Sequence, residues 1–132
     1  MTVWHGELGR KKTGGLIRPH RKKRKYELGS LSVHTKIGKM KLRHVKMKGG
    51  KIKIKAASVE FANVLNPDTN KMQKAKILDV LANPANPQWI RSKIITKGTI
   101  IKTEVGNARV TSRPSQHGIV NAVALTTEEK KR

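Results

Sequence analysis

Positive charge is concentrated so strongly at one end of this sequence that the two parts of the chain cannot fold in the same way. Residues 1–55 hold 18 lysines and arginines against two acids, whereas residues 56–132 hold 12 against six. The run Arg21–Lys25 places five like charges in a row, which repel one another unless a polyanion neutralises them. We therefore expect residues 1–40 to form an extended basic arm that is disordered on its own.

The rest of the chain is typical of an all-β, barrel-like domain, which we place at residues 41–126. Turn signals separate short apolar stretches, notably at Gly49-Gly50, at 66–70 and at Gly106-Asn107. Aromatic residues make up only 3% of the chain, so the core has to be built from Ile, Val, Leu and Ala. The final residues, 127–132, are charged and are expected to form a frayed tail.

Two stretches indicate strands directly. Lys51–Lys55 alternates isoleucine with lysine, which puts Ile52 and Ile54 on one face, and the apolar parity then shifts, so we expect a bulge near 56–58. Lys71–Leu81 fits a strand or a short helix, and we favour a strand. We expect Ile54 and Ile101 to be buried.

Later in the chain, Asn83–Pro87 reads as a rigid connector because each Asn-Pro step disfavours helical backbone. Trp89–Thr96 is apolar and β-branched, as in a strand, and Trp89 is expected in the core or at its rim. Arg113–Gly118 is expected to be a loop, and Ile119–Leu125 the last strand.

The residue types argue against catalysis, metal binding and a membrane span. The chain has no cysteine, its eight acids are scattered, and its five histidines share no ligand spacing. Gly9–Gly15 lacks the Gly-Lys-Ser/Thr ending of a phosphate loop. Apolar runs are far shorter than the ~18 residues that a membrane helix needs. We therefore expect no cofactor, no small-molecule substrate and no membrane partner.

A net charge of +22 points instead to a polyanion, with nucleic acid first and an anionic membrane surface second. Trp4 and Tyr26 are candidates for stacking on unpaired bases, with packing inside the protein as the alternative for each. No recognition helix or zinc finger is present to read DNA sequence. The candidate phosphate contacts form a nearly continuous ladder: Arg10, Lys11, Lys12, Arg18, Arg21, Lys22, Lys23, Arg24, Lys25, Lys36, Lys39, Lys41, Arg43, Lys46 and Lys48.

Several distinctive motifs occur in order along nearly the whole sequence. They are Trp4–Gly6, Arg10–Gly15, Arg21–Gly29, His34–Gly38, Asn83–Arg91, Lys93–Ile101 and Asn107–Asn121. Together they resemble eukaryotic-type small-subunit ribosomal protein eight, the version shared by archaea and eukaryotes. The chain is about as long as archaeal members, but it has Ser115 and His117 where the family often has Gly and Asp.

The resemblance implies a non-enzymatic component of the small ribosomal subunit in the cytoplasm, with an all-β domain and an N-terminal extension buried in RNA. Its implied partners are small-subunit rRNA and neighbouring small-subunit ribosomal proteins. It makes the best candidates for rRNA contact Arg10–Lys12, Arg21–Lys25, Tyr26, Thr35, Lys36, Arg109 and Arg113. Further candidates are Arg91, Lys93 and Lys97.

Two other function classes stay open on the residues alone. A chromatin-like protein that compacts nucleic acid would share the charge, but it would bind duplex DNA as well as folded RNA. An RNA-processing enzyme or chaperone would need a cluster of acids or histidines, which we cannot place. A membrane-active protein would need an amphipathic helix, and residues 1–55 show no such period.

Overall fold

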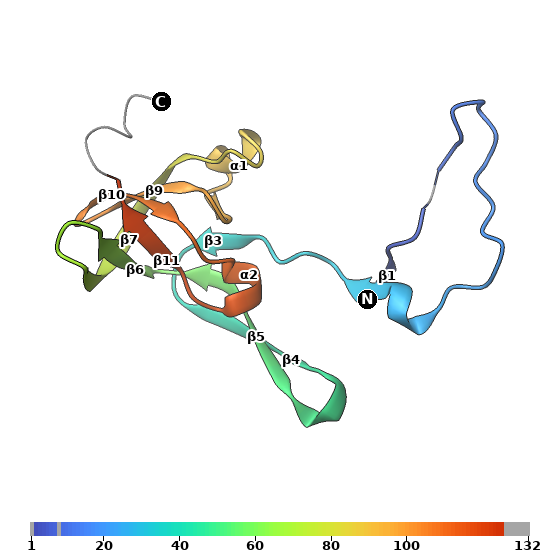
Figure 1. Cartoon of the computed structure of the whole chain (residues 1–132), viewed down its shortest axis with the longest axis horizontal. Helices are drawn as coiled ribbons and strands as arrows, with labels where there is room; N and C mark the ends of the chain where they lie inside the picture. Colours follow the sequence, from blue (N-terminus) through green and yellow to red (C-terminus); the bar gives the residue numbers. More distant parts are fainter. Residues whose placement is uncertain (1, 8, 126–132) are drawn as a thin grey trace. The chain divides into compact units, whose positions relative to one another are not determined.

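The computed structural model describes residues 2–7 and 9–125, which belong to two compact units, Met1–Ser32 and Val33–Arg132 (Figure 1). The predicted tail at 127–132 lies outside the described residues. The first unit is small and contains strands β1 (Thr2–Trp4) and β2 (Leu28–Ser30) and the 3-10 turn η1 (Lys25–Glu27).

β1 and β2 form an antiparallel pair that joins the two ends of the first unit, with Val3 opposite Gly29. Beyond Trp4, the backbone N–H of His5 donates to the carbonyl of Glu27 at 3.0 Å. The side chain of His5 lies so close to Gly29 that a Cβ at this position would collide with it. The unit therefore closes a long loop, residues 5–27, with a short ladder.

The second unit carries the remaining strands and two single helical turns. Its elements are β3 (Thr35–Ile37), β4 (Lys41–Lys46), the 3-10 turn η2 (Lys48–Gly50), β5 (Ile52–Val59), β6 (Phe61–Asn66), β7 (Lys71–Ala82), α1 (Gln88–Arg91), β8 (Ile94–Ile95), β9 (Ile100–Thr103), β10 (Gly106–Val110), α2 (Pro114–His117) and β11 (Asn121–Ala124).

Five of these strands close a barrel in the order β10-β11-β6-β7-β9, and β9 pairs with β10. All of these pairs are antiparallel except β11 with β6. The other four strands form a second sheet, β4-β5-β3-β8. The predicted all-β, barrel-like class is confirmed, and so is the strand over 71–81, which is part of the 12-residue β7.

The predicted bulge near 56–58 is confirmed by the register of β4 against β5. Lys41 lies opposite Ser58, whereas the next residue, Leu42, lies opposite Ala56. One residue of β5, Ala57, is therefore left without an opposite partner. Because of this extra residue, the buried positions of β5 change from even-numbered (Ala56) to odd-numbered (Val59).

Among residues 2–7 and 9–125, the core contains small and β-branched aliphatic residues and no aromatic ring, as the composition predicted. Ile101 has no exposed surface, which confirms the prediction for this residue. The prediction for Ile54 is wrong, because its side chain is 41% exposed. Ile54 does lie on the same face of β5 as the buried Ala56. However, the β4–β5 hairpin continues past the core at this point, so the side chain stays exposed.

Two stretches that were expected to be a strand and a loop contain helical turns. Within Trp89–Thr96 only Ile94–Ile95 is a strand, because α1 begins just after Pro87. The Asn86 side chain accepts from the Gln88 backbone N–H at 3.0 Å, and the fixed φ of proline suits a first helical turn. Arg113–Gly118 contains α2, which has Pro114 at its start and ends at Gly118, with φ 79°.

Candidate nucleic-acid interface

One carboxylate, that of Glu27, holds the first unit together. Its Oε2 accepts from the Trp4 indole N–H at 2.9 Å and from the Arg24 backbone N–H at 3.2 Å. Its Oε1 accepts from Arg21 Nη2 at 2.5 Å. Glu27, at the end of η1, thus links the basic run to β1, which is far away in the sequence.

These contacts favour the ionised form of Glu27. The hydrogen bond from Trp4, the backbone N–H of Arg24 and the guanidinium of Arg21 hold the pKa of Glu27 below its ordinary value, although desolvation opposes the shift. The same carboxylate raises the pKa of Arg21. Arg21 therefore carries its charge as part of an internal pair, with a side chain 35% exposed.

This carboxylate predicts how the first unit responds to acid. Because the pKa of Glu27 is lower in the folded than in the unfolded chain, its stabilising contribution is present above about pH 4.3 and is lost as the pH falls through the lowered pKa. We expect the NMR signal of the Trp4 indole N–H to stay constant from pH 7 to 5 and to shift below that range. In Glu27→Gln this signal should be displaced already at neutral pH. An indole signal that is indifferent to both changes would contradict this role of Glu27.

The other cations of the run are displayed outward from this framework. Lys22, Lys23, Arg24 and Lys25 are all exposed. Lys23 Nζ lies 5.4 Å from the centroid of the Trp4 ring, a cation–π contact. The free arm was predicted to be disordered, and the internal contacts of Glu27 indicate that part of this unit has a preferred local structure.

A second set of exposed cations lies on a narrow loop within the same unit. Arg10 and Leu16 form an isolated antiparallel bridge, and the Lys11 N–H donates to the Gly15 carbonyl at 2.7 Å. Gly14, with φ 86°, closes the loop tip in a conformation that favours glycine. Arg10 Nη1 donates to the Gly14 carbonyl, whereas Lys11 and Lys12 project from the tip, which is exposed.

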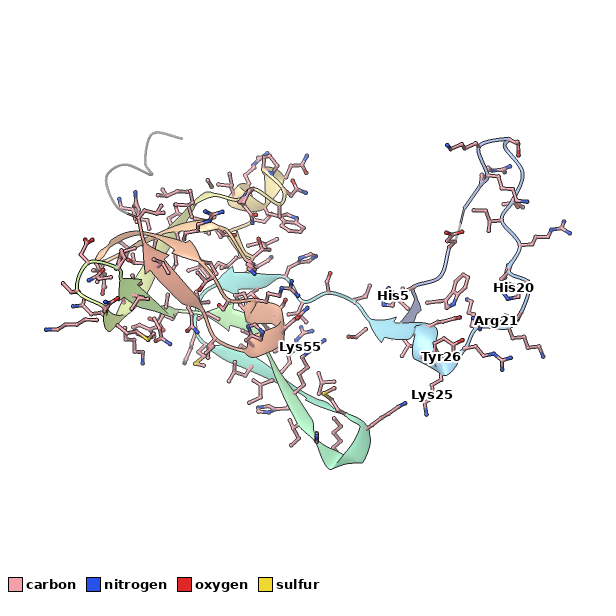
Figure 2. All side chains as sticks on the ribbon, in the orientation of Figure 1. His5, His20, Arg21, Lys25, Tyr26 and Lys55 are labelled. Atoms are coloured by element: carbon pink, nitrogen blue, oxygen red, sulfur yellow. The ribbon has the colours of Figure 1, made fainter. Side chains whose placement is uncertain are left out.

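The two aromatic candidates of the arm differ in exposure. Tyr26 is 77% exposed, and the Arg21 guanidinium carbon lies 5.7 Å from its ring centroid. Figure 2 shows Arg21, Lys25 and Tyr26 close together in this unit. Trp4 is only partly exposed, because its indole N–H is held by Glu27 and its ring covers Gly6. Tyr26 is therefore the better placed of the two to stack on a base.

In the second unit, the predicted contacts other than Thr35 are exposed. Thr35 has no exposed surface, and its hydroxyl donates to the Ala56 carbonyl at 2.8 Å. Of the neighbours Thr35 and Lys36, only Lys36 has a side chain that is available to RNA. Lys93 is 3.4 Å from Asp79, whose pKa is lowered by the Val80 backbone N–H and by this lysine. The exposed residues are Lys36, Lys39, Arg43, Lys48, Arg91, Lys93, Lys97, Arg109 and Arg113.

Sequence reasoning missed the organising role of Glu27, which it counted only as an acid in a basic arm. The available signal was its position, two residues after a run of five cations. It also missed the contact between His34 and Trp89, whose ring centroids lie 5.3 Å apart at the edge of the second unit. This pair joins residues distant in sequence, which no local pattern indicates.

Within residues 2–7 and 9–125, no group of three or more histidines and acids stands close enough to hold a metal ion. In the same part of the chain, no helix is long and apolar enough to cross a membrane. The described surface is dominated by exposed cations on both units, with few acids to balance them.

Comparison with known proteins matches the family model of ribosomal protein S8e to residues 4–125. A relative from Hyperthermus butylicus named small ribosomal subunit protein eS8 is 47% identical, covering 95% of this chain and 93% of its own. Proteins of the same name from Picrophilus torridus and Methanoregula boonei are 42% and 46% identical. They cover 95% and 93% of this chain, and 100% and 98% of their own lengths.

Proposed function

The chain belongs to the ribosomal protein S8e family, and on that premise we propose that it is a structural component of the small ribosomal subunit that binds small-subunit rRNA. The proposal places the chain in cytoplasmic ribosomes, next to other small-subunit proteins, and gives it no catalytic role. Similarity to the relatives over nearly their full lengths supports it.

The observation that carries the RNA-binding part is the arrangement around Glu27. A single internal carboxylate pairs with Arg21 and leaves the neighbouring cations exposed on one small framework. Each cation that meets a phosphate releases condensed counterions, which gives affinity without reading sequence. Phosphate and sugar contacts should therefore predominate over contacts with base edges, apart from stacking of the exposed Tyr26.

The division into two units supports a division of labour. The first unit has little apolar surface to bury, so it is suited to a cleft between RNA helices, where phosphates crowd together. The second unit has its own aliphatic core and supplies a stable body with exposed cations on its surface. We propose that RNA binding orders the first unit beyond the contacts made by Glu27.

A competition titration tests this proposal. The full chain is bound to labelled small-subunit rRNA at 0.15 M salt, and unlabelled folded rRNA or duplex DNA of equal phosphate content is added. We expect folded rRNA to compete at least tenfold better than duplex DNA. Equal competition would overturn the proposal in favour of a general nucleic-acid-compacting protein, the alternative that the charge alone leaves open.

A further inference from the structure

The hairpin formed by β4 and β5 extends beyond the rest of the second unit, with η2 at its tip (Figure 1). Its two strands are paired from Leu42 opposite Ala56 to Lys46 opposite Ile52. No acid occurs anywhere in residues 28–59, so the hairpin itself supplies only positive charge. Such a protruding basic element requires an explanation beyond stability of the core.

The register sorts the hairpin side chains onto two different faces. Directly opposite residues share a face, and successive residues alternate between faces. One face, here called the lysine face, carries Arg43 opposite Lys55 and Val45 opposite Lys53, with Lys41 next along β4. The other face carries His44 opposite Ile54 and Lys46 opposite Ile52. The lysine face therefore holds four fixed cations, and the other face holds one.

The face without this cluster meets the body of the unit only near Ile54, and its residues His44, Lys46, Ile52 and Ile54 are all exposed. Ile54 lies against α2, since a Cβ added to Gly118 would stand 3.0 Å from Ile54 Cγ2. Because the lysine face is on the opposite side of the same two strands, it points away from α2. Lys55, labelled in Figure 2, marks the base of this face.

The cations of the lysine face are regularly spaced. Arg43 stands directly across from Lys55, and Lys53 follows Lys55 on the same face of β5. Cations repeat at about 7 Å along each strand and at about 5 Å across the pair, which suits a row of phosphates.

We infer that the lysine face of the β4–β5 hairpin is a second, independent RNA-binding surface that docks on the phosphate backbone, with Lys41, Arg43, Lys53 and Lys55 as its contacts. The inference rests on the proposed function and refines it, because it assigns Lys53 and Lys55 to the interface and excludes Lys46. The remaining face of the hairpin keeps its apolar side chains away from the phosphates.

The test compares Lys53→Gln with Lys46→Gln in the full chain, bound to small-subunit rRNA over 0.05–0.3 M salt. The two variants remove the same charge from the same hairpin, but from opposite faces. For Lys53→Gln we expect the slope of log affinity against log salt to fall by roughly 0.7–0.9, about five- to eightfold in affinity at 0.1 M. Arg43→Gln combined with Lys53→Gln should double that decrease, while Lys46→Gln keeps the wild-type slope.

Equal effects of the two single changes would overturn the inference, because binding would then follow net charge and not the face. Wild-type salt slopes for both Lys53→Gln and Lys46→Gln would also overturn the inference. The hairpin lysines would then have a role in solubility alone. Both results are distinguishable from failure of the proposed function, in which the unmodified chain itself would show no preference for folded rRNA. Circular dichroism of each variant confirms that the β structure is retained.

Discussion

Replacing Lys22, Lys23 and Lys25 together by glutamine is expected to weaken binding to small-subunit rRNA on the order of a hundredfold at 0.1 M salt. All three side chains are exposed and lie beside the Glu27 carboxylate, which accepts from Trp4, Arg21 and Arg24. Three lost phosphate contacts should lower the salt slope by roughly 2.1–2.7. Filter binding or fluorescence anisotropy over a salt series measures both quantities.

The matched control replaces Lys71, Lys74 and Lys102, which are also exposed lysines but belong to β7 and β9 of the barrel. It removes the same charge by the same three substitutions. We expect it to keep the wild-type salt slope to within about one contact, roughly 0.9. Equal losses for the two triple variants would show that the arm has no special role, and only total charge would then matter.

Ile101→Ala is expected to lower the free energy of unfolding by about 2–5 kcal/mol, the range for deleting a buried isoleucine. Ile101 has no exposed surface and lies on β9, between its partners β7 and β10 in the closed barrel. Urea denaturation followed by circular dichroism measures the loss. The aliphatic core has no aromatic ring to collapse into the space, so the cavity should persist.

Ile54→Ala is the control for this prediction, because the substitution is identical and the side chain is 41% exposed. Because the side chain is so exposed, the loss should be only about 1 kcal/mol, from its remaining contact with α2. An equal loss for the two variants would mean that the hairpin packs as tightly as the barrel. That result would contradict the division between a buried core and a projecting hairpin.

Local sequence patterns predicted the parts of this fold that depend on local chemistry. The switch of apolar parity after Ile54 located the bulge, and apolar residues spread over a stretch bounded by turns located β7. Burial was harder to predict from the sequence. Ile54 and Ile101 both lie in strands with β-branched residues, and only the tertiary arrangement decides which side chain is covered.

The two helical turns escaped prediction for a related reason. An Asn-Pro step restricts the asparagine to extended backbone, and it also presets the proline for a first helical turn. The first effect, at Asn86, predicts a rigid connector, whereas both effects operate in the fold, so α1 begins directly after Pro87. Pro114 and Gly118 likewise bound α2, a turn too short for periodicity to reveal.

The candidate interface shows the same division between local and tertiary information. Exposure of the lysines in the run 21–25 could be anticipated from repulsion between like charges. The pairing of Glu27 with Arg21 and Trp4 could not, because it depends on β1 meeting β2 across the loop. Thr35 looked available beside Lys36, but the alternation of a strand turns the two side chains to opposite faces, and Thr35 is the inward one.

Sedimentation of a native lysate through sucrose gradients, at low and at high salt, tests the central claim most directly. An antibody against this chain follows its position in each gradient. A structural component whose arm is embedded in rRNA should migrate with the small ribosomal subunit and remain there at high salt. Recovery at the top of the gradient, or together with chromosomal DNA, would contradict the claim and would assign the basic arm to another polyanion.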